Sequence, residues 1–242
     1  VSDRGLGLGD GVFETLLIRG GVPQLLGEHL QRWRDGATWL QLPEPPNQQQ
    51  VEQWIAEAIR RSGIADGALR INWSRGSGGR GLQPPSQAKG RCWGSLHPHQ
   101  PSFQRQQVVI SERVQRWADD PLKGCKTLDY SAMVLARLEA SQAGASDVLL
   151  RSSQGGLCCG SSANLLVQEG GQWLTPPLSS GALPGVMRAR GVAMGLIQEA
   201  RLADSLPNEQ PALLLNSLDC RPLNHIAEPL AEPLFVQLLG SD

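Results

Sequence analysis

The sequence predicts an α+β fold organised as two lobes. Apolar segments that are typical of strands and segments with the spacing of amphipathic helices occur in both halves of the chain, without strict strand–helix alternation. A stretch rich in proline and glutamine, residues 83–104, is expected to link the lobes. With 242 residues, the chain can bury a real core. We therefore predict a small N-terminal α/β lobe over residues 1–100 and a larger C-terminal lobe over residues 101–242.

The first half is predicted to hold a hairpin, two helices and a further strand. An apolar run at residues 12–19 ends at Gly20 and Gly21, which favours a hairpin turn into a short strand at residues 22–26. Two later segments space their apolar residues three and four positions apart, as amphipathic helices do. These helices are expected at residues 28–42 and 51–61, and the further strand at residues 68–73.

The second half is predicted to hold two helices and several short strands. One helix is expected at residues 130–142, ended by Gly144, and Gly185 is expected to open another at about residues 186–199. A last apolar stretch covers residues 234–239. Strands are expected at residues 107–111, 146–151, 164–168, 172–175 and 212–216.

The composition is that of an ordinary globular protein and argues against several function classes. Apolar residues make up 40% and charged residues 19%, and the net charge of −1 disfavours a strong binder of nucleic acid or membranes. We find no run of about 18 apolar residues and no signal-peptide pattern at residues 1–5. The five cysteines lack regular spacing and the four histidines are scattered, so we expect reduced thiols, a cytoplasmic location and no metal site.

Residues 124–164 carry the most informative pattern. Lys126 and Thr127 precede an Ala-rich helical segment, and a lysine can be a Schiff-base nucleophile when its surroundings lower its pKa. The stretch ends in a small-residue loop, residues 158–164, whose backbone could approach a flat cofactor ring closely. Most lysines in proteins are solvated charges, so this pattern by itself is weak evidence for a catalytic lysine.

Three further places could bind an anion. Gly185 stands directly before a predicted helix, where backbone N–H groups and the helix dipole suit a phosphate, although a plain helix start explains the same pattern. Asn216 and Ser217 form a second possible cradle, or an ordinary turn. Arg32, on the first predicted helix, is either a surface arginine or a bidentate partner for a phosphate.

A glycine-rich stretch at residues 74–81 favours an active-site loop in which an arginine holds a carboxylate. The alternative is an RNA-binding patch, but the stretch occurs once and has only Trp73 as an aromatic neighbour. Alternating glycines from Gly5 to Gly11 mimic a dinucleotide-binding fingerprint. No strand precedes them and their spacing is wrong, so we reject that interpretation.

Taken in order, these segments resemble fold-type IV pyridoxal-phosphate enzymes, a family that contains branched-chain and D-amino-acid aminotransferases and 4-amino-4-deoxychorismate lyase. The resemblance covers nearly the whole chain, and residues 74–81 look most similar to the lyase branch. It implies a C-terminal lobe shaped as a pseudo-barrel. The landmark segments are residues 1–4, 9–15, 29–32, 126–127, 164–165 and 183–185.

The resemblance implies a role for each matching residue. Lys126 would hold the cofactor, pyridoxal 5′-phosphate, covalently, and Arg32 would bind its phosphate. Arg80 would bind a substrate carboxylate, while Arg75 would either assist or tie the loop. The cofactor would lie between the two lobes, near the interface of a homodimer. The remaining phosphate-binding groups would be the backbone N–H groups of Val186 and Met187 and the turn at Asn216 and Ser217.

One position departs from the family's pattern. Relatives carry a glutamate five residues before the Asn of an Asn-Leu pair, where it keeps the cofactor's pyridine nitrogen protonated; this chain has Cys159. A thiol with a pKa of about 8.5 cannot supply that charge pair, although it can donate a weak hydrogen bond. An elimination needs the protonated ring less than a transamination does, so Cys159 favours a lyase.

The sequence therefore predicts a cytoplasmic, homodimeric lyase that converts 4-amino-4-deoxychorismate to p-aminobenzoate and pyruvate in folate-precursor synthesis. Its partners would be small molecules, with no nucleic acid and no membrane. Two alternatives stay open. One is a branched-chain or D-amino-acid aminotransferase, and the other is a catalytically impaired relative in which Cys159 has weakened the cofactor site.

Overall fold

The computed structural model describes residues 2–78, 81–206 and 209–240, and its contacts divide the chain into two compact units. The first unit comprises Val1–Gln100 and Cys125–Asp129, and the second comprises Pro101–Gly124 and Tyr130–Asp242. The segment that carries Lys126 therefore groups with the first unit, whereas the sequence analysis placed this lysine in the C-terminal lobe. Among the described residues, no helix combines the length and the hydrophobicity needed to cross a bilayer.

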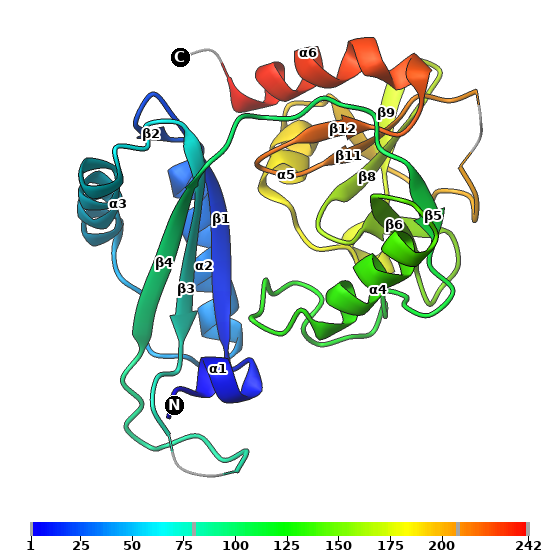
Figure 1. Ribbon diagram of the computed structural model, residues 1–242. Helices are drawn as coiled ribbons and strands as arrows, with labels where there is room; N and C mark the ends of the chain where they lie inside the picture. Colours follow the sequence, from blue (N-terminus) through cyan, green and yellow to red (C-terminus); the bar gives the residue numbers. More distant parts are fainter. Residues whose placement is uncertain (1, 79–80, 207–208, 241–242) are drawn as a thin grey trace. The chain divides into compact units, whose positions relative to one another are not determined.

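The first unit is built on an antiparallel sheet in the order β2-β1-β3-β4 (Figure 1). Its strands are β1 (Gly11–Arg19), β2 (Val22–Pro23), β3 (Gly67–Ser74) and β4 (Arg91–Pro98). Gly20 and Gly21 turn between β1 and β2 with φ angles of 53° and 80°. Glycine adopts such angles without a steric penalty. The antiparallel pairing of β1 with β2 confirms the predicted hairpin, whose second strand is shorter than expected.

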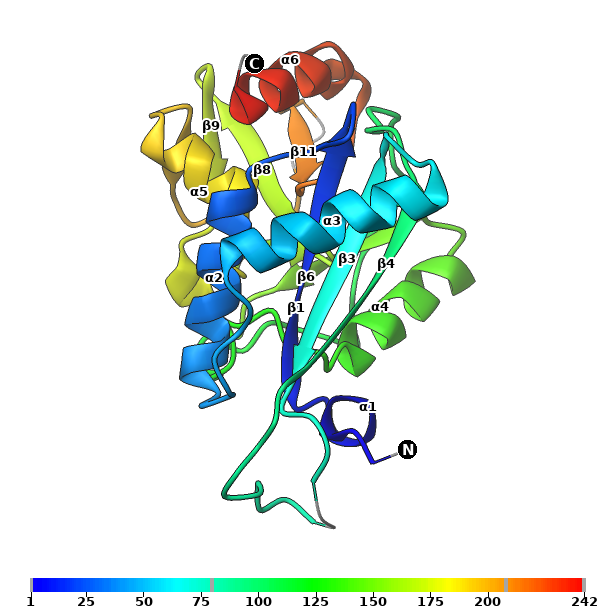
Figure 2. The same cartoon turned by 90° about the vertical axis from the view of Figure 1, so that its left-hand side faces the viewer.

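Two helices cover one face of this sheet, as Figure 2 shows for α3 lying across the strands. The helices of the unit are α1 (Arg4–Leu8), α2 (Leu26–Trp39) and α3 (Gln48–Ser62). Their core joins Val12, Leu16 and Ile18 of β1 to Leu30 and Trp33 of α2 and to Val51 and Ile55 of α3. Both predicted helices are confirmed. Helix α1 was not predicted, because two of its five residues are glycines, which disfavour helices.

Strand β4 lies inside the stretch that the sequence analysis interpreted as a link, and that interpretation is wrong for residues 91–98. All eight residues of β4 pair with β3, from Ser74↔Arg91 to Gly67↔Pro98. Pro98 is the last residue of an edge strand, a position where the missing N–H breaks no ladder bond. Proline in this segment therefore ends a strand of the sheet.

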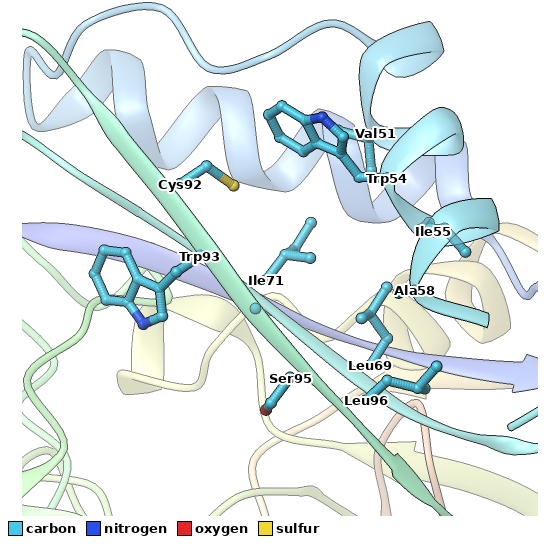
Figure 3. Close-up of a pocket in the computed structure, with 11 residues that line it drawn as sticks. Val51, Trp54, Ile55, Ala58, Leu69, Ile71, Cys92, Trp93, Ser95 and Leu96 are labelled. Carbon is cyan, nitrogen blue, oxygen red and sulfur yellow. The ribbon is translucent and has the colours of Figure 1, made fainter. Parts of the chain in front are cut away.

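A cavity of about 250 Å³ opens between α3 and the strands β3 and β4 (Figure 3). Its lining is mainly apolar and includes Trp54, Ile71 and Leu96. Burial raises the pKa of the lining Cys92 thiol to about 11. The cavity lies on the helix-covered side of the sheet, because Ile71 also belongs to the core against α2 and α3.

The second unit contains a mixed sheet that curls into a half-barrel (Figure 1). The strands run in the order β10-β9-β8-β7-β6-β5, and β11 pairs with both β8 and β12. Among the strand pairs of the residues that the structure describes, β5–β6 and β9–β10 are parallel and the others are antiparallel. The strands are β5 (Val108–Ile110), β6 (Asp147–Arg151), β7 (Leu157–Gly160), β8 (Asn164–Glu169), β9 (Gln172–Thr175), β10 (Ile197–Glu199), β11 (Ala212–Leu215) and β12 (Cys220–Pro222). This architecture confirms the predicted fold class.

Strand β7 replaces part of the small-residue loop predicted at residues 158–164. All four of its residues are buried, and it pairs with β6 and β8. Cys158 and Cys159 have side chains that suit a packed strand, and only residues 161–163 remain as a tight connection. The prediction of a loop was therefore wrong for the two cysteines.

The helices of the second unit are α4 (Ser131–Gln142), α5 (Val186–Ala193) and α6 (Glu228–Leu239), with short 3₁₀ turns at Leu178–Ser180 and His225–Ala227. Helix α4 packs Ala136 and Ala140 against β6. Helix α5 ends six residues before its predicted end, because Gly195 turns the chain with a φ of 72° and Ile197 begins β10. The apolar stretch predicted at residues 234–239 forms the second half of α6.

Candidate active site

Lys126 lies on a short extended segment that adds to the edge of β1 not occupied by β3. The backbone N–H of Phe13 donates to the carbonyl oxygen of Lys126 at 2.9 Å, and the N–H of Leu128 donates to the carbonyl oxygen of Gly11 at 2.9 Å. These two bonds explain why the segment groups with the first unit. Because side chains alternate along paired strands, Lys126 faces the same side of the sheet as Phe13.

The ring of Phe13 holds two cationic side chains. Nζ of Lys126 lies 4.3 Å from the ring centroid, and the guanidinium carbon of Arg70 lies 3.7 Å from the same centroid. Phe13 is buried and Lys126 is half-buried. A cation on an aromatic face gains about 0.5–2 kcal/mol, depending on desolvation. Phe13 therefore fixes the position of the Lys126 amine, and two neighbouring cations make this face suited to an anionic ligand.

Glu14, the next residue of β1, points to the opposite face and holds Arg32 of α2. Nε of Arg32 donates to Oε1 at 2.7 Å and Nη2 donates to Oε2 at 2.6 Å. Nδ1 of His29 lies 2.7 Å from the same Oε2. Burial raises the pKa of Glu14, but the charge of Arg32 and the hydrogen bonds from both partners lower it to about 2. Glu14 is therefore an ionised carboxylate at neutral pH.

The shifted pKa of Glu14 predicts a pH-dependent stability. A carboxyl group that titrates at about 2 when folded, against an ordinary value of 4.5, stabilises the fold fully above pH 4.5 and loses this effect as the pH falls toward 2. The shift corresponds to about 3 kcal/mol. Urea denaturation of wild type and Glu14→Gln should show a difference in unfolding free energy that is largest near neutral pH and shrinks below pH 4.5. A difference that stays constant down to pH 3 would contradict this.

Of the two arginines assigned to the substrate, Arg75 lies among the residues that the structure describes. Arg75 is buried, and its Nε donates to Asp10 at 2.8 Å. Its Nη1 and Nη2 donate to the carbonyl oxygens of Gln41 at 2.7 Å and Leu40 at 2.8 Å. These bonds tie the end of β3 to the end of α2, which matches the second of the two roles expected for Arg75. Arg80 lies outside the described residues.

In the second unit, Asn164 connects the other residues assigned to the cofactor. As the first residue of β8, it pairs with Cys159 of β7 and with Leu215 of β11, the residue before Asn216. Its side-chain Nδ2 donates to the carbonyl oxygen of Leu183, in the turn before α5, at 3.0 Å. One asparagine thus brings together β7, the turn after β11 and the start of α5.

The start of α5 offers backbone donors that no side chain caps. Gly185 is its N-cap and makes no side-chain hydrogen bond. A Cβ at this position would lie 2.0 Å from Oδ1 of Asn164, far below the 3.0 Å that real side chains respect, so only glycine fits. The N–H groups of the first helical turn, including those of Val186 and Met187, have no intrahelical acceptor. This donor set fits a phosphate group.

The turn between β11 and β12 uses the side chain of Asn216 internally. Its Oδ1 accepts from the N–H groups of Leu218 at 2.8 Å and Asp219 at 2.9 Å, and its Nδ2 donates to the carbonyl oxygen of Ser162 at 3.4 Å. Ser217, at the tip, is half-buried. A ligand at this turn would therefore meet the Ser217 hydroxyl and the backbone, while Asn216 shapes the turn.

Cys159 is buried and faces the same side of the sheet as its partner Asn164. Cys158 lies at a bulge in the β6–β7 pairing and shares a core cluster with Cys159, and its Sγ donates to the carbonyl oxygen of Ser180 at 3.4 Å. Of the two adjacent thiols, Cys159 is the one whose residue pairs directly with Asn164.

Sequence reasoning gave no role to Phe13, Glu14, His29 or Asn164, although all four lie in the landmark segments. One signal could have identified the pair in α2. His29 and Arg32 are three positions apart on a helix, and a glutamate inside the apolar run of β1 needs a buried cationic partner.

Comparison with known proteins adds to this geometry. The sequence profile of the family described as amino-transferase class IV matches residues 11–226. A putative branched-chain-amino-acid aminotransferase of Methanocaldococcus jannaschii is 30% identical over 190 residues, which cover 78% of this chain and 66% of the relative. A bifunctional aminodeoxychorismate lyase / D-amino acid transaminase of Mycobacterium tuberculosis is 30% identical over 185 residues, covering 70% and 63% of the two chains. The chain thus spans just under two thirds of the length of these relatives.

The fold is also found among solved structures. The crystal structure of a putative 4-amino-4-deoxychorismate lyase from Legionella pneumophila superimposes with a TM-score of 0.89 and covers 98% of this chain and 93% of its own. The sequence identity is 23%, so this likeness concerns the fold.

Proposed function

Because the chain belongs to the amino-transferase class IV family of pyridoxal-phosphate-dependent enzymes, we propose that it is a lyase acting on 4-amino-4-deoxychorismate. The products would be p-aminobenzoate and pyruvate. The observation that carries the choice of a lyase is Cys159, a thiol side chain paired with Asn164 where the family resemblance expects a glutamate. The name of the M. tuberculosis relative, which includes aminodeoxychorismate lyase, supports the same choice.

The residues described above fit pyridoxal 5′-phosphate. The proposed phosphate ligands are Arg32, the N–H groups of Val186 and Met187, and the turn at Asn216 and Ser217. Lys126 would bind the cofactor covalently and Cys159 would contact its pyridine nitrogen. The glycine cradle at the start of α5 and the two cations on Phe13 support this assignment. When bound, the cofactor withdraws electrons from the amine-bearing carbon of the substrate.

Lys126 would then move the proton. Its Nζ would take the proton from the amine-bearing carbon, acting as a general base, and the contact with Phe13 would stabilise the resulting ammonium. The bond between the ring and the enolpyruvyl oxygen breaks, and the leaving group takes up a proton to become pyruvate. Aromatisation of the ring drives this step. Arg80 would orient a substrate carboxylate.

Product analysis tests the proposed reaction. Purified protein with pyridoxal phosphate and 4-amino-4-deoxychorismate is expected to form pyruvate and p-aminobenzoate in equal amounts. An aminotransferase, the function in the name of the M. jannaschii relative, is the second candidate. Transfer of amino groups to 2-oxoglutarate without pyruvate formation would select it. If neither activity is found, the chain is a catalytically impaired relative.

Cys159 gives a direct prediction about reaction type. In Cys159→Glu, a carboxylate can keep the pyridine nitrogen protonated, so we expect transamination of amino acids to rise relative to pyruvate release. Cys159→Ser should retain the wild-type ratio, because a hydroxyl, like a thiol, can donate a hydrogen bond to the ring nitrogen. The matched control is Cys158→Ser, which changes the adjacent thiol, whose Sγ donates to the carbonyl oxygen of Ser180. An unchanged ratio in Cys159→Glu, measured with both assays, would argue against contact between this residue and the cofactor.

We also propose that the enzyme is a homodimer in the cytoplasm and serves folate-precursor synthesis. Sedimentation equilibrium at micromolar concentration is expected to give twice the mass of the chain, and a monomer would contradict the dimer.

A further inference from the structure

Glu14 is a buried charge in a contact that is otherwise apolar. Val12 and Leu16, two positions before and after it in β1, pack against Leu30 and Trp33 of α2. Glu14 itself is fully buried. Burying a carboxylate carries a desolvation penalty even when it is paired. An apolar residue would make the same strand–helix contact without this penalty. The carboxylate is better explained by what it holds.

Glu14 holds the guanidinium of Arg32 in one orientation. Nε and Nη2 each donate to a different oxygen of Glu14, at 2.7 Å and 2.6 Å. This two-point fork fixes the plane of the guanidinium as well as its position. The side chain of Arg32 is 12% exposed, against 0% for Glu14, so part of it reaches the surface of the unit. A single buried carboxylate thus fixes the orientation of a side chain that is partly exposed.

His29 holds the same carboxylate from a second direction. Its Nδ1 lies 2.7 Å from Oε2, the oxygen that also accepts from Nη2 of Arg32. His29 is 1% exposed, and its Nε2 has no hydrogen-bond partner among the residues that the structure describes. An unpaired buried nitrogen destabilises a fold. The buried Nε2 of His29 is therefore not explained by stability, whereas the bond from Nδ1 limits the movement of the carboxylate.

We propose that Glu14 and His29 are positioning residues that hold the Arg32 guanidinium ready for the cofactor phosphate. This inference rests on the proposed function. Under this proposal, Glu14 and His29 affect the binding of the cofactor phosphate and take no part in proton transfer at Lys126.

The proposal predicts a loss of affinity that depends on the phosphate. Glu14→Gln replaces one acceptor oxygen by an NH₂ group that faces a guanidinium donor, so the two-point fork opens and no longer fixes the plane of the guanidinium. Hydrogen bonds to charged groups are worth about 1.5–3 kcal/mol, so we expect pyridoxal phosphate to bind about tenfold or more weakly. Pyridoxal, which lacks the phosphate, should bind the variant as it binds wild type, to within about twofold. A general loss of structure would weaken both ligands alike.

The experiment is a titration of wild type and variants with each ligand, followed by the visible absorbance of the bound form. The variants are Glu14→Gln and His29→Gln, the second of which leaves the Glu14–Arg32 fork intact and should give a smaller loss in the same direction. Glu28→Gln is the matched control, because it makes the same change on an exposed residue of α2. In an Arg32→Lys background, Glu14→Gln should cause no further phosphate-dependent loss.

Three outcomes separate this inference from the function on which it rests. A selective loss of pyridoxal phosphate binding in both variants, absent in Glu28→Gln, supports it. Equal losses for the two ligands, or none, in folded Glu14→Gln and His29→Gln would overturn it while leaving the proposed function standing. A wild-type chain that binds neither ligand would overturn the proposed function and the inference together. Should Glu14→Gln not fold, the decision rests on His29→Gln.

Discussion

Replacing Lys126 by alanine is expected to remove both the covalent attachment of pyridoxal phosphate and the formation of p-aminobenzoate. Lys126 is the amine that the cation–π contact with Phe13 holds in place, and the proposed reaction gives it both cofactor binding and proton transfer. Loss of the general base alone should lower the rate about 10²- to 10⁴-fold. The rate is measured by the release of pyruvate and p-aminobenzoate under saturating cofactor.

Lys123→Ala is the matched control for this prediction. Lys123 lies three residues earlier, and its Nζ donates to the carbonyl oxygen of Ala118 within the second unit. Its loss should leave the covalent attachment unchanged. A Lys126→Ala protein that still made p-aminobenzoate at the wild-type rate would refute the assignment of this lysine.

The second large effect is expected from Gly185→Ala. The added Cβ would lie 2.0 Å from Oδ1 of Asn164, so either the asparagine or the start of α5 must move. Overpacking of this kind costs about 1–3 kcal/mol. Any shift of α5 also displaces the N–H groups that we assign to the phosphate. We therefore expect a lower melting temperature and an affinity for pyridoxal phosphate reduced about tenfold or more.

Two further variants test the cause of that effect. Gly27→Ala adds the same methyl group in α2, where nothing lies within 4 Å, and should be harmless. Asn164→Ala removes the clashing oxygen, so adding Gly185→Ala to it should cost little more. Full additivity of the two changes in the melting temperature would show that the clash with Asn164 is not the cause.

The sequence was sufficient for the elements with strong periodicity. Helices α2 and α3 repeat their apolar residues at helical spacing, β1 is a largely apolar run, and glycines mark the turns after β1 and α3. Strands β4 and β7 were missed for different reasons. β4 is an exposed edge strand bounded by proline, and β7 is short and built of small residues, so tertiary pairing decides both.

For the candidate site, the sequence identified residues but not the strand pairing and hydrogen bonds that connect them. Lys126 was expected with the C-terminal half, because sequence order carries no information about the backbone bonds that attach it to β1. The same limit applies to Asn164, whose link between Cys159 and the start of α5 depends on strand register. Arg75 shows the opposite case, since its environment of one carboxylate and two carbonyl oxygens cannot be inferred from a glycine-rich pattern.

The central claim is that this chain binds pyridoxal phosphate through Lys126. The most direct test incubates purified protein with the cofactor, records the visible absorbance band, reduces the adduct with borohydride and maps the labelled peptide by mass spectrometry. We predict a single label on Lys126. A chain with no band and no label, or with the label on another lysine, would contradict the account.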